Sequence, residues 1–334
     1  MTTQVQVLEY GPFALFARTH PEVTRWVFSG RSVEHFPGSY VRPFSLKRLV
    51  ALLDLVRRPG PGVVACHVPG PRLPRIDLGR LGYAAILRWS ARPIVGLDFN
   101  DEIPLADVAL RVLERSTLYF KREMPFRRDD LIATGDTASG ETLRHNLDKL
   151  RPVSIGLAPW RVADPPDPLP PKSADVFFAG STRPELRRRG AEQLTRLRDS
   201  GVAVDFVDGF LPRPGYLARM ARAYLAWSPE GAGWQCFRHL EAPFVATVPV
   251  MSWRRVEVPW PLQDGEHCFE YEPEGDDLSR VMRRALVDRD RLRSMARAAR
   301  ERVLAHHGHR TVADEILSAV GAEAYPRANL RSRK

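Results

Sequence analysis

Short apolar runs alternate with amphipathic segments along most of this sequence, and this alternation limits the possible folds more than any other feature. Runs such as Val63–His67, Pro93–Asp98 and Thr117–Lys121 predict buried strands, because they are apolar and are bounded by turn-forming residues. The segments Leu78–Trp89 and Leu105–Arg115 between them predict helices. Strands separated by helices are typical of parallel βαβ units, so the sequence predicts an α/β fold.

The alternation breaks once and then restarts. Residues 163–172 (ADPPDPLPPK) contain five prolines, which exclude helix and central strand. We therefore predict an N-terminal Rossmann-like domain over 1–162, a linker over 163–172, a C-terminal Rossmann-like domain over 173–310, and a helix over 311–325 that packs back on the N-terminal domain. Ligands of parallel sheets bind beyond the carboxyl ends of the strands, so we expect the two domains to face each other across a cleft. The other predicted strands are Thr24–Phe28, Val153–Leu157, Asp175–Ala179, Ala203–Val207, Ala223–Trp227 and Val248–Met251, and the other predicted helices are Ser45–Arg58, Pro184–Asp199, Tyr216–Ala221, Trp234–Val245, Leu278–Val287, Arg289–His306 and Ala313–Val320.

The charge of the chain is strongly basic. The formal net charge is +10, which suits nucleic acid, an anionic membrane or a phosphorylated small molecule as partner. The sequence has no helix-turn-helix or RNP-like pattern, and its arginines are mixed with acids. We therefore expect a solvated basic surface and no nucleic-acid partner, and leave peripheral membrane contact open.

The sequence predicts a cytoplasmic protein without a metal site. It has no secretory signal and no apolar run long enough to span a membrane, and its three cysteines fit neither a disulfide framework nor a zinc pattern. Cys66 and Cys236 are interpreted as buried apolar residues. The histidines at 306, 307 and 309 either bind metal or, as we expect, form the cap of a helix C-terminus.

The segment Gly180-Ser181-Thr182-Arg183 follows a predicted strand and precedes a predicted helix. Small residues let the backbone approach a ligand, a helix N-terminus offers N–H groups, and an arginine can bind phosphate through two hydrogen bonds. The segment therefore suits a diphosphate, although it is not a GxGxxG pattern. The alternative is an ordinary turn in which Ser181 or Thr182 caps the helix.

Three side chains share one face of the predicted helix over 234–245. Trp234, Arg238 and Glu241 are spaced i, i+4 and i+7. In this arrangement the Glu241 carboxylate can accept two hydrogen bonds from a ribose diol, and Trp234 can stack on a base or line a sugar pocket. The alternative is a core tryptophan with Arg238 and Glu241 as a surface pair.

Acids gather after the predicted strand over 93–98. Asp98, Asp101 and Glu102 lie where the cleft is expected, so one of them can act as a general base or bind sugar hydroxyls. The alternative is that they cap the next helix. His67 ends a neighbouring strand and is a weaker candidate. Lys121-Arg122 ends the predicted strand over 117–121. This pair either binds an anion or has only a surface role.

A set of C-terminal motifs occurs in an order and spacing typical of one protein family. They are Phe178-Ala179-Gly180-Ser181, Glu230-Gly231, Arg238-His239-Leu240-Glu241-Ala242, Thr247-Val248-Pro249-Val250, Asp264-Gly265-Glu266-His267-Cys268-Phe269 and Arg300-Glu301-Arg302-Val303-Leu304. Together they resemble the C-terminal domain of GT-B glycosyltransferases, and most closely the CgeB-like and exostosin-like groups. The resemblance covers residues 175–318 well. It covers the N-terminal half only in fragments, at 98–101 and 119–122.

The resemblance implies a glycosyltransferase of the hexosyltransferase type, which moves a sugar from a nucleotide-diphosphate-sugar donor to an acceptor hydroxyl. It implies that Glu241 binds the ribose hydroxyls and that Arg238 lies near the donor phosphate or sugar. The other residues of the predicted donor site are Gly180, Ser181, Arg183, Gly233 and Trp234. The acceptor, a natural product, a lipid-linked saccharide or a glycan, would enter from the N-terminal domain. No metal or other cofactor is expected, because helix dipoles and basic side chains stabilise the leaving diphosphate.

Two positions depart from the family pattern. Gly233 stands where the retaining branch often has a second glutamate, and Thr247 stands where a glycine is usual, so the stereochemical outcome is not assigned. If the reaction inverts, Asp98 or Asp101 would deprotonate the acceptor hydroxyl. An oxidoreductase is the less favoured reading, because it would need a GxGxxG pattern. The other alternative is a non-catalytic nucleotide- or polyanion-binding protein derived from the same fold, and it would show neither donor hydrolysis nor transfer.

Overall fold

The chain forms two compact units. The computed structural model describes residues 7–10, 15–20, 22, 24–27, 50, 53–54, 56–59, 62–68, 78–132, 137–158 and 168–324. Unit 1 comprises residues 1–153 and 310–334, and unit 2 comprises residues 154–309. The predicted linker over 163–172 falls within the range of unit 2, and its residues 163–167 lie outside the described residues.

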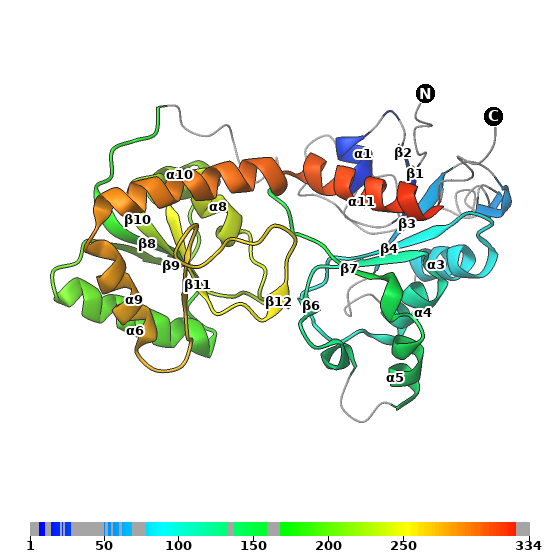
Figure 1. Ribbon diagram of the computed structural model, residues 1–334, viewed down its shortest axis with the longest axis horizontal. Helices are drawn as coiled ribbons and strands as arrows, with labels where there is room; N and C mark the ends of the chain where they lie inside the picture. The colour runs from blue at the N-terminus through cyan, green and yellow to red at the C-terminus, as the bar shows by residue number, and fades with distance from the viewer. Residues whose placement is uncertain are drawn as a thin grey trace, which may run out of the picture. The chain divides into compact units, whose positions relative to one another are not determined.

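Unit 1 is built on a parallel sheet (Figure 1). Its elements are β1 (Val7–Tyr10), α1 (Leu15–Thr19), β2 (Thr24–Val27), β3 (Val63–His67), α3 (Leu78–Trp89), β4 (Ile94–Asp98), α4 (Asp107–Arg115), β5 (Leu118–Lys121), β6 (Met124–Pro125), η1 (Arg128–Leu131), α5 (Thr137–Arg144), η2 (Leu147–Lys149), β7 (Leu150–Pro152) and α11 (His309–Ala324). The strand order is β2-β1-β3-β4-β5-β7. The direction in which strands are added to the sheet therefore reverses between β1 and β3.

Helices cover both faces of this sheet. Phe16 of α1 and Ile316 of α11 belong to one buried cluster. Ile86 of α3, Leu113 of α4 and Leu143 of α5 belong to another. Figure 1 shows α1 beside α11, with α3, α4 and α5 on the other side of the sheet. The two clusters are the two layers that a parallel sheet needs to bury both of its faces.

Unit 2 repeats this architecture. Its elements are β8 (Ala174–Gly180), α6 (Glu185–Asp199), β9 (Val204–Asp208), α7 (Arg213–Ala221), β10 (Ala223–Ser228), α8 (Arg238–Phe244), β11 (Val248–Ser252), β12 (Val256–Glu257), β13 (Phe269–Tyr271), α9 (Asp277–Leu286) and α10 (Arg289–His306). The sheet order is β13-β11-β10-β8-β9, and these strands pair in parallel. The direction in which successive strands are added to the sheet reverses between β8 and β10. Sheets of this kind bind ligands at the carboxyl edge beside such a reversal. The predicted α/β class, with a parallel sheet in each half, is confirmed.

The core of unit 2 depends on a close approach of α6 to the sheet. A Cβ atom on Gly190 of α6 would lie 2.0 Å from Cζ2 of Trp227, which is fully buried. The Trp227 ring packs 4.4 Å from Phe178, and its indole N–H donates to the Tyr271 hydroxyl at 3.0 Å. Figure 1 shows α6 beside α9 on one face of this sheet and α8 beside α10 on the other.

Lys172 binds the ends of two helices of unit 2. Its ammonium donates to the carbonyls of Ala221 at 2.9 Å, Ala223 at 2.8 Å and Ala246 at 2.7 Å. Ala221 ends α7, and Ala246 follows α8 closely. Burial lowers the pKa of Lys172 to about 8, so the side chain is still charged at pH 7. One cation therefore satisfies carbonyls that helix ends leave without partners.

The strand predicted over Val153–Leu157 is wrong. The strand is β7, which pairs with β5 through Leu150 and Tyr119. Beyond it the chain turns, because Gly156 has a φ of +71° and its N–H donates to the Ser154 hydroxyl at 3.1 Å. Leu157 keeps only an isolated bridge. A left-handed glycine next to a side-chain-capped turn stops the pairing.

The helix predicted over Trp234–Val245 begins later, at Arg238. The preceding residues are held in a turn, because the Gly231 N–H donates to the Gly233 carbonyl at 2.9 Å. The Trp234 indole donates to the carbonyls of Ser252 and Trp253, both at 3.1 Å. These bonds to distant backbone hold residues 231–234 outside the helix. Most of the helix predicted over 45–58 lies outside the described residues.

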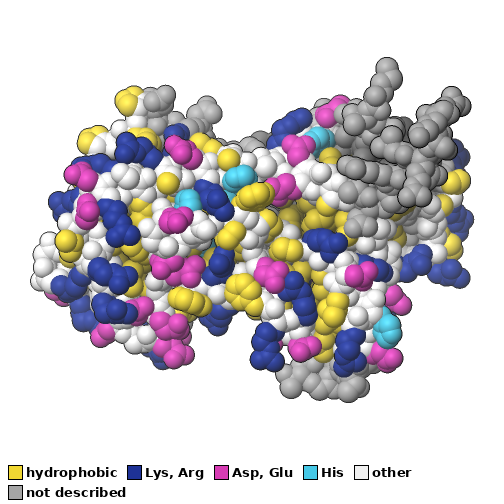
Figure 2. Space-filling view, in the orientation of Figure 1, with side chains coloured by type: hydrophobic (Ala, Val, Ile, Leu, Met, Phe, Trp, Pro, Cys, Tyr) yellow, Lys and Arg dark blue, Asp and Glu magenta, His cyan; other side chains and the backbone are white. Residues whose placement is uncertain are grey.

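The surface mixes both signs of charge. Figure 2 shows basic side chains interspersed with acidic ones on the face viewed. Arg188 lies 2.7 Å from Glu185 and 2.6 Å from Glu192, which illustrates how arginines are paired along α6. In the parts of the chain that the structure describes, no helix has the length and apolar character that crossing a bilayer requires.

Candidate functional site

The carboxyl edge of unit 2 brings basic side chains to the point where the strand order reverses. Arg187 of α6 donates through Nε and Nη2 to the Glu230 carbonyl at 3.1 and 3.0 Å, and through Nη1 to the Ser181 carbonyl at 3.4 Å. Ser181 follows β8 and Glu230 follows β10. Arg187 therefore links the two loops that border the expected ligand position.

Arg238 and Gly180 meet at the end of β8. Arg238 Nη2 donates to the Ala179 carbonyl at 2.8 Å, and the guanidinium lies 4.9 Å from the Phe178 ring. A Cβ atom on Gly180 would lie 3.0 Å from Arg238 Nη2. Only glycine lets the arginine approach this closely without displacement. The sequence places both residues at a donor site, and the structure brings them into contact.

Glu241 is a buried carboxylate in the same cluster. Its side chain is 2% exposed, and its Oε1 lies 2.9 Å from Arg213 Nη1. Its Oε2 accepts from the Tyr216 hydroxyl at 3.2 Å, and Arg238 Nε donates to that hydroxyl at 3.3 Å. Burial raises the pKa of Tyr216, so the phenol keeps its proton and can donate. The result is a connected chain from Arg238 through Tyr216 to Glu241.

Ser181 and Arg183 lie in the exposed loop before α6. The Thr182 N–H donates to Asp208 Oδ1 at 3.0 Å, and the Arg183 N–H donates to the Ser181 hydroxyl at 3.3 Å. The N-cap of α6 is Pro184, and no side chain caps the helix. The alternative that Ser181 or Thr182 caps α6 is therefore wrong. The first turn of a long helix stays available to an anion at this edge.

Trp234 does not share a helix face with Arg238 and Glu241, because it precedes α8. Its indole is bonded to the backbone of Ser252 and Trp253, and its ring packs 4.8 Å from the His239 ring. Gly233 lies in the turn before it. The shared face predicted from the spacing is wrong, whereas a donor-binding role for Trp234 and Gly233 stays a prediction.

The two acids predicted for catalysis lie in unit 1 and differ in their surroundings. Asp98 is 2% exposed, and its Oδ2 accepts from the Tyr119 hydroxyl at 2.9 Å and from Lys121 Nζ at 3.1 Å. Asp101 is 48% exposed and pairs with Arg122. Because Lys121 and Arg122 are buried, the alternative of a surface role for them is wrong. The Asp98 carboxylate is thus enclosed by its two partners, whereas that of Asp101 is partly open to solvent.

A further buried pair lies where the strand order of unit 1 reverses. Glu9 near the end of β1 and His67 at the end of β3 are both fully buried, with His67 Nε2 2.7 Å from Glu9 Oε1. The Phe16 N–H also donates to Glu9 Oε1, at 3.2 Å. Sequence reasoning noted His67 but missed Glu9.

The predicted cap of a helix C-terminus is confirmed for His307, which is the C-cap of α10 and whose N–H donates to the Val303 carbonyl. His307 is buried, and its Nδ1 and Nε2 lie 2.8 Å from the Ser154 hydroxyl and 2.9 Å from the Trp260 carbonyl. The side chain therefore ties two segments of unit 2 together. Among the described residues, no three His, Cys, Asp or Glu side chains are grouped as a metal site would need.

Sequence reasoning missed Arg187, Arg213 and Tyr216 as site residues. Tyr216 and Arg213 lie on α7, which follows β9. Phe210 lies in the loop between β9 and α7 and is fully exposed. Residues 209–216 follow the carboxyl end of β9, so the tendency of ligands to bind at the carboxyl ends of parallel strands is the sequence signal that points to them.

Residues 216–318 match the model of a family described as glycosyl transferase-like. This range includes Tyr216, Arg238 and Glu241. No curated protein matches the sequence.

Several solved structures share the fold. HepE from Anabaena in complex with UDP has a TM-score of 0.57 at 12% identity, with 95% of this chain and 100% of that chain covered. Sucrose-phosphate synthase from Thermosynechococcus elongatus has a TM-score of 0.57 at 12% identity, with 97% and 100% covered. A glycosyltransferase from Rickettsia africae has a TM-score of 0.58 at 10% identity, with 96% and 99% covered.

The chain therefore has the fold of GT-B glycosyltransferases, and the resemblance to that class is confirmed. The narrower resemblance to the CgeB-like and exostosin-like groups stays a prediction.

Proposed function

We propose that this chain, whose fold is that of the GT-B glycosyltransferases, transfers a sugar from a nucleoside-diphosphate-sugar to an acceptor hydroxyl. The observation that carries the proposal is the position of Glu241. It is a buried carboxylate held by Arg213 and Tyr216, in a cluster with Arg238 at the reversal point of a parallel sheet. A carboxylate can accept hydrogen bonds from both hydroxyls of a ribose, and the neighbouring guanidinium groups suit a diphosphate.

In the proposed complex the diphosphate lies against Gly180 and Ser181 at the start of α6. Arg183, Arg187 and Arg238 supply positive charge at this edge, and α6 adds its N–H groups. The leaving diphosphate gains negative charge during transfer, so fixed cations and dipoles there stabilise the transition state more than the bound donor. We propose on this basis that the transfer needs no metal ion.

The base of the nucleotide is proposed to stack on Phe210. This side chain is fully exposed in the loop between β9 and α7, and Arg213 at the start of α7 pairs with Glu241. An exposed aromatic side chain at a binding edge offers a flat apolar surface to a base. HepE is crystallised with UDP and with UDP-glucose, which supports UDP as the first nucleotide to test.

Unit 1 is proposed to bind the acceptor, which is a natural product, a lipid-linked saccharide or a glycan. Asp101 is the better of the two predicted bases, because its carboxylate is half exposed whereas Asp98 is locked by Lys121 and Tyr119. In an inverting reaction Asp101 would take the proton of the acceptor hydroxyl as that oxygen attacks the sugar. Asp98 would then position the strand end that carries it.

The test is a thermal-shift screen of the full chain with UDP, GDP, dTDP, CDP and ADP, with and without EDTA, and with NAD and NADP. A ligand that binds only the folded state at 100 times its Kd adds about 2.7 kcal/mol to the free energy of unfolding. We expect one diphosphate to raise the Tm, EDTA to leave the shift unchanged, and Glu241→Ala to abolish it.

The matched control is Glu192→Ala, because Glu192 is an exposed acid of unit 2 whose carboxylate lies 2.6 Å from Arg188. It should leave the shift intact. A shift with a dinucleotide alone would overturn the proposal in favour of an oxidoreductase. Binding of a diphosphate without hydrolysis or transfer of the matching nucleotide sugar, over a panel of the three acceptor classes, would favour the non-catalytic alternative.

A further inference from the structure

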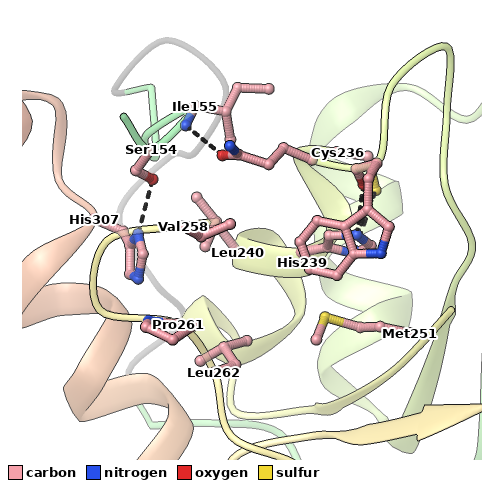
Figure 3. A pocket seen from close by; sticks show the side chains of 12 residues that line it. Ser154, Ile155, Cys236, His239, Leu240, Met251, Val258, Pro261, Leu262 and His307 are labelled. Atoms are coloured by element: carbon pink, nitrogen blue, oxygen red, sulfur yellow. Dashed lines mark hydrogen bonds between the residues drawn. The ribbon is translucent and has the colours of Figure 1, made fainter. Parts of the chain in front are cut away.

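Cys236 contributes a thiol to a small pocket of unit 2. The pocket has a free volume of about 30 Å³, and Trp234, Cys236, His239, Leu240 and Met251 are among the side chains that line it. Figure 3 shows Cys236 beside the ring of His239, with Met251 and Leu240 around the same space. Cys236 is partly exposed, whereas Cys66 and Cys268 are buried. It is therefore the most exposed of the three cysteines.

A histidine and a serine converge on this thiol. His239 Nδ1 lies 3.4 Å from Cys236 Sγ and 2.6 Å from the Ser228 hydroxyl. His239 Nε2 lies 2.9 Å from the Trp234 carbonyl. A carbonyl can only accept, so Nε2 carries a hydrogen and Nδ1 is left as the acceptor. In the neutral pair Nδ1 accepts from the Ser228 hydroxyl. When that hydroxyl, which lies 3.7 Å from Cys236 Sγ, turns to donate to the sulfur, Nδ1 can take the thiol proton, and a thiolate–imidazolium pair results.

The charges around the pair favour the thiolate. Burial raises the pKa of the Cys236 thiol, but the charge and hydrogen bond of His239, the charge of Arg238 and the hydrogen bond from Ser228 outweigh it and lower the pKa to about 6. Other ionisable groups also interact with the thiol or with its neighbours. They are Arg187 of α6, Tyr216 of α7, Glu230 after β10, Glu241 of α8, and Glu270 and Tyr271 of β13. Burial raises the pKa of Cys66 to about 12 and raises that of Cys268 as well.

We propose that Cys236 is a site of thiol–disulfide exchange and that it accepts low-molecular-weight disulfides. The Cys236 thiolate attacks one sulfur of the disulfide, and a new S–S bond joins it to that half of the reagent. The S–S bond of the reagent breaks, and the other half leaves as a thiolate that takes the proton from His239 or from water. One disulfide is consumed and one is formed, so no further oxidant is needed.

The adduct has a consequence for the neighbouring site. A free volume of about 30 Å³ has room for little more than water, so we expect the group attached to Cys236 to displace residues that line the pocket. Cys236 precedes Arg238, the first residue of α8, and the same helix carries Glu241. We therefore expect the mixed disulfide to lower the affinity for the nucleotide. This consequence, unlike the exchange itself, rests on the proposed function.

The exchange is tested with reduced full-length protein and dithiodipyridine, which releases a coloured thiopyridone for each thiol that reacts. We expect one fast equivalent per chain at pH 7, assigned to Cys236 by peptide mass mapping. The rate of this fast phase should fall as the pH is lowered, with a midpoint near pH 6. Cys236→Ser should remove the fast phase, whereas Cys66→Ser and Cys268→Ser should keep it. A Cys236 that reacts only after unfolding, or that follows the profile of an ordinary thiol with a midpoint above pH 8, would overturn the proposal.

Two variants test the role of the cluster. His239→Gln should move the midpoint of the labelling rate to higher pH by at least one unit, because the imidazolium is the main favourable charge beside the thiolate. Ser228→Ala, which removes one hydrogen bond and keeps the histidine, should move it less and serves if His239→Gln does not fold. An unchanged midpoint in Ser228→Ala and in a folded His239→Gln contradicts the assigned mechanism.

Nucleotide binding is measured separately on the reduced protein and on the purified mixed disulfide. A fall of ten-fold or more in the adduct, reversed by a reducing agent, supports the coupling between the sites. Equal affinity in both forms would overturn the coupling and leave the exchange in place. If the reduced protein binds no nucleotide, the proposed function fails, while the labelling experiment still decides whether Cys236 exchanges.

Discussion

Arg213 and Glu241 form an ion pair of 2.9 Å in which the two partners differ sharply in exposure. The arginine side chain is 36% exposed, and the carboxylate is 2% exposed. Arg213 is therefore the solvent-accessible partner of a carboxylate that is itself covered. Under the proposed function, a ribose diol that binds the carboxylate would share or displace this bond, so the affinity for a nucleotide would depend on how firmly the rest of the cluster holds Glu241.

Tyr216→Phe tests that cluster. The substitution removes the hydroxyl that joins Arg238 Nε to Glu241 Oε2, and each buried polar group that loses its partner costs about 1–3 kcal/mol. We expect nucleotide affinity, measured by isothermal titration calorimetry, to fall at least ten-fold. Tyr224→Phe is the control, because the Tyr224 hydroxyl bonds Arg293 at an exposed position. Equal affinity in wild type and Tyr216→Phe would show that this cluster does not contribute to nucleotide binding.

Gly190→Ala tests the contact between α6 and the sheet. Alanine in a helix is normally favoured over glycine by about 1 kcal/mol, but a methyl group here would overlap the Trp227 ring. Overpacking of a buried site typically costs about 1–3 kcal/mol, so we expect a net loss of stability in urea unfolding. Gly215→Ala on α7 meets no atom within 4 Å and should be neutral or stabilising. A larger loss of stability in Gly215→Ala than in Gly190→Ala would contradict the packing of α6 against Trp227.

Lys172→Met tests the cation that joins the ends of α7 and α8. Methionine keeps most of the apolar chain but leaves the carbonyls of Ala221, Ala223 and Ala246 without their charged donor. We expect the free energy of unfolding at pH 7 to fall by about 3 kcal/mol. Lys149→Met is the matched control, because Lys149 bonds a single carbonyl at an exposed position. Equal losses of unfolding free energy in both variants would show that the three carbonyls around Lys172 add no stability beyond that of a single surface hydrogen bond.

His307 makes stability depend on pH. Burial, together with the charges of His306 and Arg302, lowers its pKa to about 4, although the hydrogen bond to the Trp260 carbonyl acts in the opposite direction. Between pH 6.5 and 4 the unfolded chain takes up a proton that the folded chain does not. Unfolding free energy therefore falls as the pH falls through this window, by up to about 3 kcal/mol.

His307→Gln should flatten this slope in denaturant unfolding measured at several pH values, because glutamine does not titrate. The exposed His145, replaced by Gln, should leave the slope as in wild type. A wild-type slope in His307→Gln would assign the pH dependence to other groups.

The strands whose charged residue stands at the end of an apolar run, as in β4 and β5, could be predicted, whereas β1, which has a buried charge within the run, could not. β3 and β4 are apolar runs that are buried along their whole length, and both appear where the sequence places them. β1 was missed because Glu9 interrupts its apolar pattern. Its partner His67 lies 58 residues away in the sequence, so the burial of that acid depends on a tertiary pairing that no local window contains.

The candidate site shows the same limit. Gly180, Arg238 and Glu241 could be named because motif spacing and strand ends mark them, and the structure gathers them together. Arg213 and Tyr216 belong to no motif, and only the packing of α7 against α8 brings them to Glu241. Trp234 fitted a helical period, yet bonds to the backbone of β11 and the following residue hold it outside the helix.

The return of the chain to unit 1 sets an order of events during protein synthesis. Phe16 and Leu97 share their buried cluster with Ile316 and Val320 of α11. The ribosome must therefore complete almost the entire chain before the core of the N-terminal unit can close, whereas unit 2 is continuous in sequence and can fold earlier. A premature stop codon shortly before α11 would consequently damage the half of the protein that was translated first.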